Sequence, residues 1–366
     1  MDNYRPQIGT LIKDLDTPCL IVDMDALEHN YGNVASTYKD TVVKMRQHSK
    51  NIKSPAIANM QIREGGTMGG VCAAKVSEAE VMVDGGIHDV LVTSQLPTKD
   101  KILRLCNLAK RADMKVVIDD PRNLRLISAI AQENKVTIGV LIEVDTSMHR
   151  AGIRTASQGV ELAKQATDLP GIDFKGVMSH QSLLGKPDRE TRFIEGRRYM
   201  QMCLDVKTAI EDEGIPVEIV STGETWTIDV AADMPGITEV EGGTYALMAH
   251  SNDYMEDYDI AVKVLSTVIS TPRSSTAIGD VGIRALASPN GVLPAIDGDL
   301  KIKVEGLFDE HIVLRSQGEM PLKIGDKFLL SSGQQDITVN RWDKFIGIRD
   351  GKVEAIFDIL ARGCHN

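Results

Sequence analysis

Eight short apolar segments alternate with helical segments between residues 41 and 241, and this alternation limits the possible folds more than any other feature. The segments expected as strands are 41–47, 70–74, 89–93, 115–119, 136–145, 172–178, 217–221 and 237–241. Those expected as helices are 54–64, 77–85, 98–112, 121–133, 156–168, 190–213 and 224–233. Buried strands that alternate with helices form parallel sheets covered on the outside. Eight such units predict a closed (β/α)8 barrel, with a doubly wound open sheet as the alternative.

The pattern changes after about residue 255, where alternating strands replace the helices. Strand-like alternation covers 261–270, 300–304, 311–314, 327–331 and 352–357, with Gly, Pro and Asp between the segments. Such a series predicts two packed sheets or a small barrel. We therefore expect an α/β protein in which a (β/α)8 barrel over 20–255 is followed by a mostly antiparallel β domain, built from 1–19 plus 256–366.

Composition and charge exclude several classes of function. Hydrophobic residues make up 42% and charged residues 25% of the 366, which is ordinary for a globular protein. The net charge of −11 argues against nucleic acid or an anionic membrane as a partner. We find no apolar run of membrane-spanning length and no secretory signal. Five scattered cysteines without a CxxC pair predict reduced thiols and a cytoplasmic location.

Candidate site residues follow the strands, because the chemistry of a parallel barrel collects at the carboxyl ends of its strands. His48 and Lys50 follow the first strand. Taken alone, this stretch reads as solvated surface charge, but neighbouring cations and partial burial can make such a lysine nucleophilic. Thr222-Gly223 and Gly242-Gly243-Thr244 follow the last two strands and offer backbone N–H groups and hydroxyls for a phosphate. A lysine and a phosphate site are what pyridoxal phosphate requires.

The chain resembles a known family along nearly its whole length. The resemblance is carried by Asp16–Asp23, Arg46–Lys50, Lys53–Pro55, Gly70–Ala74, Ser77–Glu80, Glu143–Asp145, Met148–Gly152, Glu241–Tyr245, Asp309–His311, Asp336 and Thr338–Asn340. These motifs are similar to those of the pyridoxal-phosphate enzymes of the alanine-racemase-like barrel type, in the D-threonine aldolase and D-serine dehydratase branch. The resemblance implies pyridoxal 5'-phosphate as cofactor, a small amino acid as substrate, and a homodimer whose active sites are each completed by the partner's β domain.

The resemblance also implies roles for individual residues. Lys50 looks like the lysine that forms a Schiff base with the cofactor, and Arg150 like the arginine beside the pyridine nitrogen. His180 stands where the family has a tyrosine, and it is a candidate for acid/base work or for stacking on the cofactor ring. The remaining candidates for cofactor binding are His48 and the phosphate residues Thr222, Gly223, Gly243, Thr244 and Tyr245.

The metal site of the family is altered in this chain. The family binds a divalent cation (Mn²⁺, Mg²⁺ or Zn²⁺) through a histidine and an acidic residue or cysteine two positions later, whereas here these positions hold Gln334 and Asp336. We expect a lyase for a small D-configured β-hydroxy amino acid that catalyses aldol cleavage. The alternatives are a dehydratase of the D-serine or 3-hydroxyaspartate type, a metal-independent racemase, and a non-catalytic pyridoxal-phosphate binding protein. A barrel enzyme without pyridoxal phosphate is the generic alternative.

Overall fold

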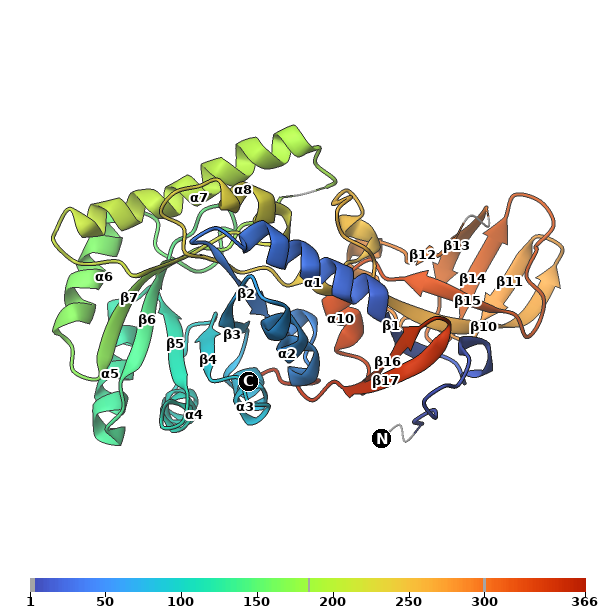
Figure 1. The fold of residues 1–366 in the computed structure, drawn as a ribbon, viewed down its shortest axis with the longest axis horizontal. Coiled ribbons are helices and arrows are strands. Elements are labelled where there is room, and N and C mark those ends of the chain that lie inside the picture. The colour runs from blue at the N-terminus through green and yellow to red at the C-terminus, as the bar shows by residue number, and fades with distance from the viewer. Residues whose placement is uncertain (1–3, 184, 299–300) are drawn as a thin grey trace. The chain divides into compact units, whose positions relative to one another are not determined.

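The structure, a computed structural model, describes residues 4–183, 185–298 and 301–366 and divides into two compact units (Figure 1). Unit 1 takes the chain up to Tyr31, Asn51–Ser54 and Thr244–Gly363. Unit 2 takes Gly32–Lys50, Pro55–Gly243 and Cys364–Asn366. Residues 20–31 and 244–255, which we expected in the barrel part, therefore belong to unit 1. Leu300, where one strand was expected to begin, lies outside the described residues.

Unit 2 contains a closed barrel of eight parallel strands, so the predicted (β/α)8 barrel is confirmed and the open sheet was the wrong alternative. The strands are β2 (Lys44–His48), β3 (Thr67–Ala73), β4 (Asp89–Val92), β5 (Asp113–Ile118), β6 (Ile138–Glu143), β7 (Ile172–Met178), β8 (Ile219–Ser221) and β9 (Glu239–Val240). Pairing of β2 with β9 closes the barrel. Closure directs the carboxyl ends of all eight strands to one mouth.

Helices cover the outside of the barrel strands (Figure 1). They are α2 (Pro55–Glu64), α3 (Val76–Asp84), α4 (Lys99–Ala109), α5 (Pro121–Asn134), α6 (Ala156–Asp168), α7 (Arg189–Glu211) and α8 (Ile228–Ala232). Local chemistry explains where several begin. Asp120 accepts a hydrogen bond from the Arg122 N–H ahead of α5, and Thr155 forms a capping box ahead of α6. No helix of the described residues is long and apolar enough to cross a membrane.

A buried charge network, which we call the floor, fills the end of the barrel opposite the mouth. The Arg46 side chain is 1% exposed, and two of its nitrogens donate to the two Glu239 oxygens at 2.7 Å each. Arg46 Nη1 also donates to Asp89 at 2.7 Å, and Lys115 donates to Asp89 at 2.9 Å and to Asp113 at 2.7 Å. Because the arginine pairs in bidentate fashion with Glu239, its cost of burial is offset by strong charge-assisted hydrogen bonds.

Two glycines make room for the floor side chains. A Cβ added at Gly70 would lie 2.8 Å from Arg46 Nη1, and one at Gly139 would lie 2.8 Å from Lys115 Cγ. Above the floor, the apolar side chains of Cys72, Leu91, Val117, Leu141 and Met178 form a cluster. The interior is therefore layered, with paired charges at the floor, apolar side chains in the middle and the mouth above them.

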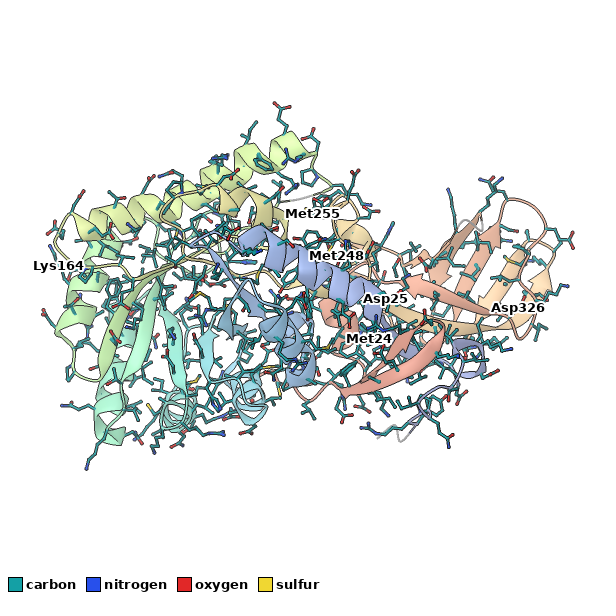
Figure 2. The ribbon with its side chains drawn as sticks, in the orientation of Figure 1. Met24, Asp25, Lys164, Met248, Met255 and Asp326 are labelled. Atoms are coloured by element: carbon teal, nitrogen blue, oxygen red, sulfur yellow. The ribbon has the colours of Figure 1, made fainter. Side chains whose placement is uncertain are left out.

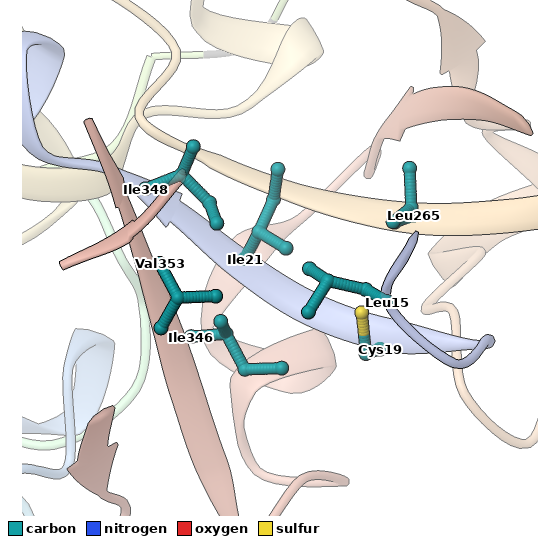
Figure 3. Close-up of a cluster of buried hydrophobic side chains, with 7 residues drawn as sticks. All are labelled: Leu15, Cys19, Ile21, Leu265, Ile346, Ile348 and Val353. Atoms are coloured by element: carbon teal, nitrogen blue, oxygen red, sulfur yellow. The ribbon is translucent and has the colours of Figure 1, made fainter. Parts of the chain in front are cut away.

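Unit 1 is built on a nine-stranded sheet that is mostly antiparallel, as predicted. Its strands are β1 (Cys19–Asp23), β10 (Val262–Arg273), β11 (Thr276–Gly279), β12 (Ala295–Ile296), β13 (Ile302–Leu307), β14 (Ile312–Ser316), β15 (Lys327–Ser331), β16 (Lys344–Arg349) and β17 (Lys352–Asp358). β1 pairs antiparallel with β10 and parallel with β16. A buried cluster holds these strands together, made of Leu15, Cys19, Ile21, Leu265, Ile346, Ile348 and Val353 (Figure 3).

Helix α1 (Met24–Tyr38) begins directly after β1, and Met24 and Asp25 mark its first turn (Figure 2). The Arg349 guanidinium pairs with Asp25 and, at 2.6 Å, with Glu28, which joins this first turn to β16. Short helical turns complete the described structure. They are η1 (Ile12–Asp14), η2 (Ser49–Asn51), η3 (Thr225–Thr227), α9 (Thr244–Leu247), η4 (His250–Asn252), η5 (Pro289–Gly291) and α10 (Gln335–Val339).

Replacement of the floor arginine tests how much the barrel depends on it. We expect Arg46→Met to lower the free energy of unfolding by about 3–5 kcal/mol, because Glu239 is left buried and unpaired. The matched control is Lys164→Met on the outer side of α6 (Figure 2), whose pair with Glu213 is half exposed on both sides and contributes about 1 kcal/mol or less. Urea unfolding measures the free energy of unfolding of both variants. An equal decrease in the two would contradict the conclusion that the floor stabilises the barrel.

Candidate active site

A cavity of about 230 Å³ lies at the mouth of the barrel. Its walls are formed by His48, Lys50, Ala74, Thr93, Ser94, Gln95, Glu143, Arg150, Ala151, Met178, His180 and Glu241. Four residues predicted from the sequence, namely His48, Lys50, Arg150 and His180, are among them. The cavity lies entirely within unit 2, so these side chains meet through the barrel strands alone.

The local structure after β2 presents Lys50 to the cavity. The strand ends at His48, where the His48 N–H donates to the Gly242 carbonyl at 2.8 Å, and the chain then turns through η2. The His48 ring is buried, and its Nδ1 accepts from the Lys50 N–H at 3.5 Å. Nε2, the other ring nitrogen, lies 3.3 Å from Thr93 Oγ1. His48 thus holds the turn from which the half-buried Lys50 side chain extends.

His180 follows β7 and is half-buried in the cavity wall. Burial, together with the positive charges of Lys50 and Arg150, lowers the pKa of its imidazole to about 3. The ring is therefore neutral at pH 7, when it can accept a proton or a hydrogen bond or stack on an aromatic group.

Two buried carboxyl groups complete the polar wall. Gln95 Nε2 donates to Glu143 at 2.5 Å, and the nearest oxygen of Glu143 lies 3.9 Å from Arg150 Nη2. Ser221 Oγ donates to Glu241 at 2.9 Å. Burial raises the pKa of Glu143, and it raises the pKa of Glu241 to about 8.

Several residues of the cavity wall were not predicted from the sequence. They are Ala74, Thr93, Ser94, Gln95, Glu143, Ala151, Met178 and Glu241. The signal that could have found most of them is their position at or just after the end of a strand. Thr93, Ser94 and Gln95 follow β4 in this way, and Glu143 and Glu241 stand at the end of β6 and directly after β9 within the family motifs.

The residues predicted to hold a phosphate fall into both units. Thr222 follows β8 in unit 2, where its hydroxyl meets Ser179 Oγ and Gln181 Nε2 at 2.6 Å each. Gly223 has a positive φ of 87°, which a glycine adopts without strain. Neither is among the residues lining the cavity. Their binding of a phosphate stays a prediction.

Gly243 ends a segment of unit 2, whereas Thr244 and Tyr245 belong to unit 1. Within unit 1, Asn51 Nδ2 donates to Thr244 Oγ1 at 3.4 Å. The Tyr245 ring is fully buried and makes edge contacts with Tyr31 and Tyr258, at centroid distances of 6.2 Å each. These contacts show that Tyr245 is part of the core of unit 1. Its contact with a phosphate stays a prediction.

Pyridoxal phosphate matches the chemistry of the cavity wall. The wall offers a lysine amine for an aldehyde, a neutral imidazole to pack against an aromatic ring, and buried carboxyl and hydroxyl groups for polar atoms. Lys50, His48, His180 and Arg150 would hold the group.

The residues predicted to bind a metal do not form a metal site. Gln334 precedes α10, and its carbonyl accepts from Thr338 Oγ1 at 3.1 Å. Asp336 accepts from the Ile337 N–H at 2.8 Å. Across residues 4–183, 185–298 and 301–366, no group of three or more His, Cys, Asp or Glu could hold an ion. One carboxylate and one amide are too few strong ligands for Mn²⁺, Mg²⁺ or Zn²⁺, so the residues present do not fit the metal.

Comparisons with known proteins match the chain over nearly its full length. The family model described as alanine racemase, N-terminal domain, matches residues 22–250, and the putative serine dehydratase domain matches residues 261–348. A 3-hydroxy-D-aspartate aldolase of Paracoccus denitrificans (strain Pd 1222) is 34% identical over 96% of this chain and 93% of its own length.

Two D-threonine aldolases are similarly related. The enzyme of Arthrobacter sp is 31% identical, over 98% of this chain and 95% of its own length. The crystal structure of the enzyme from Filomicrobium marinum superposes with a TM-score of 0.94 and 31% identity, covering 99% of this chain and 100% of that one.

Removal of divalent cations tests the interpretation of Gln334 and Asp336. Because the described residues offer no three-ligand site, we expect dialysis against a chelator to change turnover less than twofold. Gln334→His, which adds an imidazole two positions before Asp336, should bind Mn²⁺ more tightly than the unaltered chain in calorimetry. A loss of turnover on chelation that added Mn²⁺ restores would contradict our interpretation.

Proposed function

Because the chain belongs to the alanine-racemase-like family of pyridoxal-phosphate enzymes, we propose that it is a lyase that cleaves a small D-configured β-hydroxy amino acid. The observation that carries the proposal is the position of Lys50 in a cavity at the barrel mouth, beside the neutral imidazole of His180. The aldolase activity of the 34% and 31% identical relatives favours cleavage between Cα and Cβ over dehydration.

In the proposed reaction, the bond between Cα and Cβ breaks and its electron pair stays with Cα. The β-hydroxyl loses its proton and becomes the carbonyl of an aldehyde, and Cα gains a proton, so the products are glycine and the aldehyde. When bound, pyridoxal phosphate supplies an aldehyde that reacts with amines and a conjugated ring that withdraws electron density from Cα.

Among the residues of the chain, Lys50 would anchor the cofactor and move a proton. Its side chain extends from a turn held by the His48 ring, and its amine reaches the cavity in which an amino acid would bind. A lysine in that place anchors the cofactor and can return a proton to Cα after cleavage.

His180 has the second role, as acceptor of the proton from the β-hydroxyl. Two nearby positive charges, on Lys50 and Arg150, oppose protonation of its ring. When the Lys50 nitrogen is neutral, one of these charges is gone and the imidazole becomes a better proton acceptor. No step requires a metal, in keeping with the donor set at Gln334 and Asp336.

The proposal includes a homodimer in the cytoplasm. The dimer follows from the resemblance of the chain to its family. The five cysteines are free thiols, and four of them are buried, which supports a reducing compartment.

Replacement of Lys50 tests the central assignment. Protein reconstituted with pyridoxal phosphate should show a visible absorption band that borohydride abolishes, because reduction converts the covalent link into a stable amine. We expect Lys50→Ala to lack the band, whereas Lys75→Ala, a lysine outside the cavity wall, should keep it. A band of normal intensity in Lys50→Ala would show that another amine binds the cofactor.

Product analysis on a panel of D-β-hydroxy amino acids separates the proposed activity from its alternatives. Glycine plus an aldehyde supports the proposal. Ammonia plus a keto acid would indicate a dehydratase, an L-configured product would indicate a racemase, and no product would indicate a binding protein.

Replacement of His180 tests its role in proton transfer. We expect His180→Asn to lower kcat by about 10²–10³-fold while the absorption band persists, because loss of a positioned base costs about this much. The exposed His29→Asn in unit 1 is the control. Since the pKa of His180 is about 3, its protonation should leave kcat/KM unchanged above about pH 5. An acid limb near pH 6.5 that disappears in His180→Asn would contradict this.

A further inference from the structure

Glu241 is a buried carboxyl group in the cavity wall to which the proposed reaction gives no role. It follows β9, and its side chain is on the same face of the strand as that of Glu239, two residues earlier. Glu239 meets Arg46 in the floor, whereas Glu241 lines the cavity together with Lys50. The residue is 2% exposed, so its carboxyl group is largely removed from water.

The surroundings of Glu241 leave it without a cation. Ser221 Oγ donates to its Oε1 at 2.9 Å, and Cys72 also faces the carboxyl. The nearby charged groups are Glu239, Arg46 and Glu143. Arg46 is committed to Glu239 and Asp89, and no ion pair joins Glu241 to a lysine or arginine in the part of the chain that the structure describes.

Glu143 differs from Glu241 in this respect. The Gln95 amide donates to Glu143, and the Arg150 guanidinium lies 3.9 Å away. Its charge therefore has partners within the chain. Glu241 is next to a hydroxyl and a thiol but no paired cation, so its carboxyl has hydrogen-bonding capacity left for a ligand that can neutralise it.

A basic aromatic nitrogen is the ligand group that suits such a carboxyl. A carboxyl and a pyridine nitrogen can share one proton, and the pair is neutral overall whichever atom holds it. Burial penalises an isolated carboxylate, but it penalises far less a carboxylate that faces a protonated ring nitrogen. Pyridoxal phosphate carries such a nitrogen.

We propose that Glu241 hydrogen bonds to the ring nitrogen of pyridoxal phosphate and supplies its proton, in place of the expected Arg150. The inference rests on the proposed function, because it requires that the cofactor binds beside Lys50. β9 is next to β2 in the barrel, and the His48 N–H donates to the carbonyl of Gly242, which follows Glu241. Glu241 and Lys50 therefore lie within two residues of a backbone hydrogen bond that joins the two chain segments.

This assignment has a chemical consequence for the reaction. A protonated ring nitrogen withdraws electrons from Cα more strongly than an unprotonated one, whereas a guanidinium at the nitrogen would keep it unprotonated. The Arg150 side chain, half exposed and beside Glu143, remains available for the carboxylate or the hydroxyl of a substrate. The cavity would then place the protonated cofactor ring, a strong electron acceptor, beside the neutral imidazole of His180, which can act as a base. This combination is suited to lyase chemistry.

The test measures the protonation state of the ring nitrogen directly. Protein is reconstituted with pyridoxal phosphate labelled with ¹⁵N in the ring, and the ¹⁵N chemical shift reports whether the nitrogen carries a proton. We expect a protonated nitrogen at pH 7 in the unaltered protein and an unprotonated one in Glu241→Gln. Glutamine has the shape of the neutral acid and no proton to give, so the variant should fold. Glu143→Gln, the matched buried carboxyl, should leave the shift as it is.

A second measurement uses affinity. Replacement of the ring nitrogen of the cofactor by carbon should weaken binding to the unaltered protein about 10- to 100-fold, the effect of losing a hydrogen bond to a charged group. In Glu241→Ala the two cofactors should bind equally. The same ¹⁵N shift in Glu241→Gln as in the unaltered protein, with aldol cleavage intact, would overturn the role of Glu241 alone. Failure of the unaltered protein to bind pyridoxal phosphate would overturn the proposed function as well.

Discussion

The buried contact between Arg46 and Glu239 is the interaction on which the barrel depends most. Arg46 lies on β2 and Glu239 on β9, the first and last strands, so the two hydrogen bonds of 2.7 Å hold the barrel closed from inside. Closure directs the strand ends to one mouth. The same strand pair continues upward to Lys50 on one side and Glu241 on the other, so the geometry of the cavity is inherited from the floor beneath it.

The mouth and the floor differ in the charge of their buried titratable groups. In the floor, each buried cation has carboxylate partners within hydrogen-bonding distance. In the mouth, burial leaves His180 neutral and favours the neutral form of Glu241. Groups held neutral by burial can exchange protons with a ligand, whereas fully paired charges cannot without losing their partners. The barrel thus separates a region that stabilises the fold from a region that can carry out chemistry.

Most of the fold could be predicted from the sequence because its signals are local. Each barrel strand is a short apolar run bounded by turn residues, and Lys50 and His180 could be found because they follow such runs. The place of β1 could not be predicted, because its pairing with β10 and β16 joins segments far apart in the chain. β11, β12 and β16 were not expected at all. The protonation state of the Glu241 carboxyl depends on Ser221 and Arg46, which are close in space but distant in the sequence. No local sequence pattern shows these contacts.

The close packing around Gly70 and Gly139 limits how this chain can diverge. A methyl group at Gly70 would press on the Arg46 guanidinium and the Asp89 carbonyl, and one at Gly139 would press on the Lys115 stem. A shorter side chain in place of Arg46 or Lys115 would leave a carboxylate buried without its cationic partner. The glycines, the cations and the acids can therefore change only together. The mouth residues are also coupled, through Gln95, Glu143 and Arg150 on one side and Ser221 and Glu241 on the other. A single substitution in the floor is therefore costly, and a tolerated change there requires a second one that restores both the space and the charge pairing.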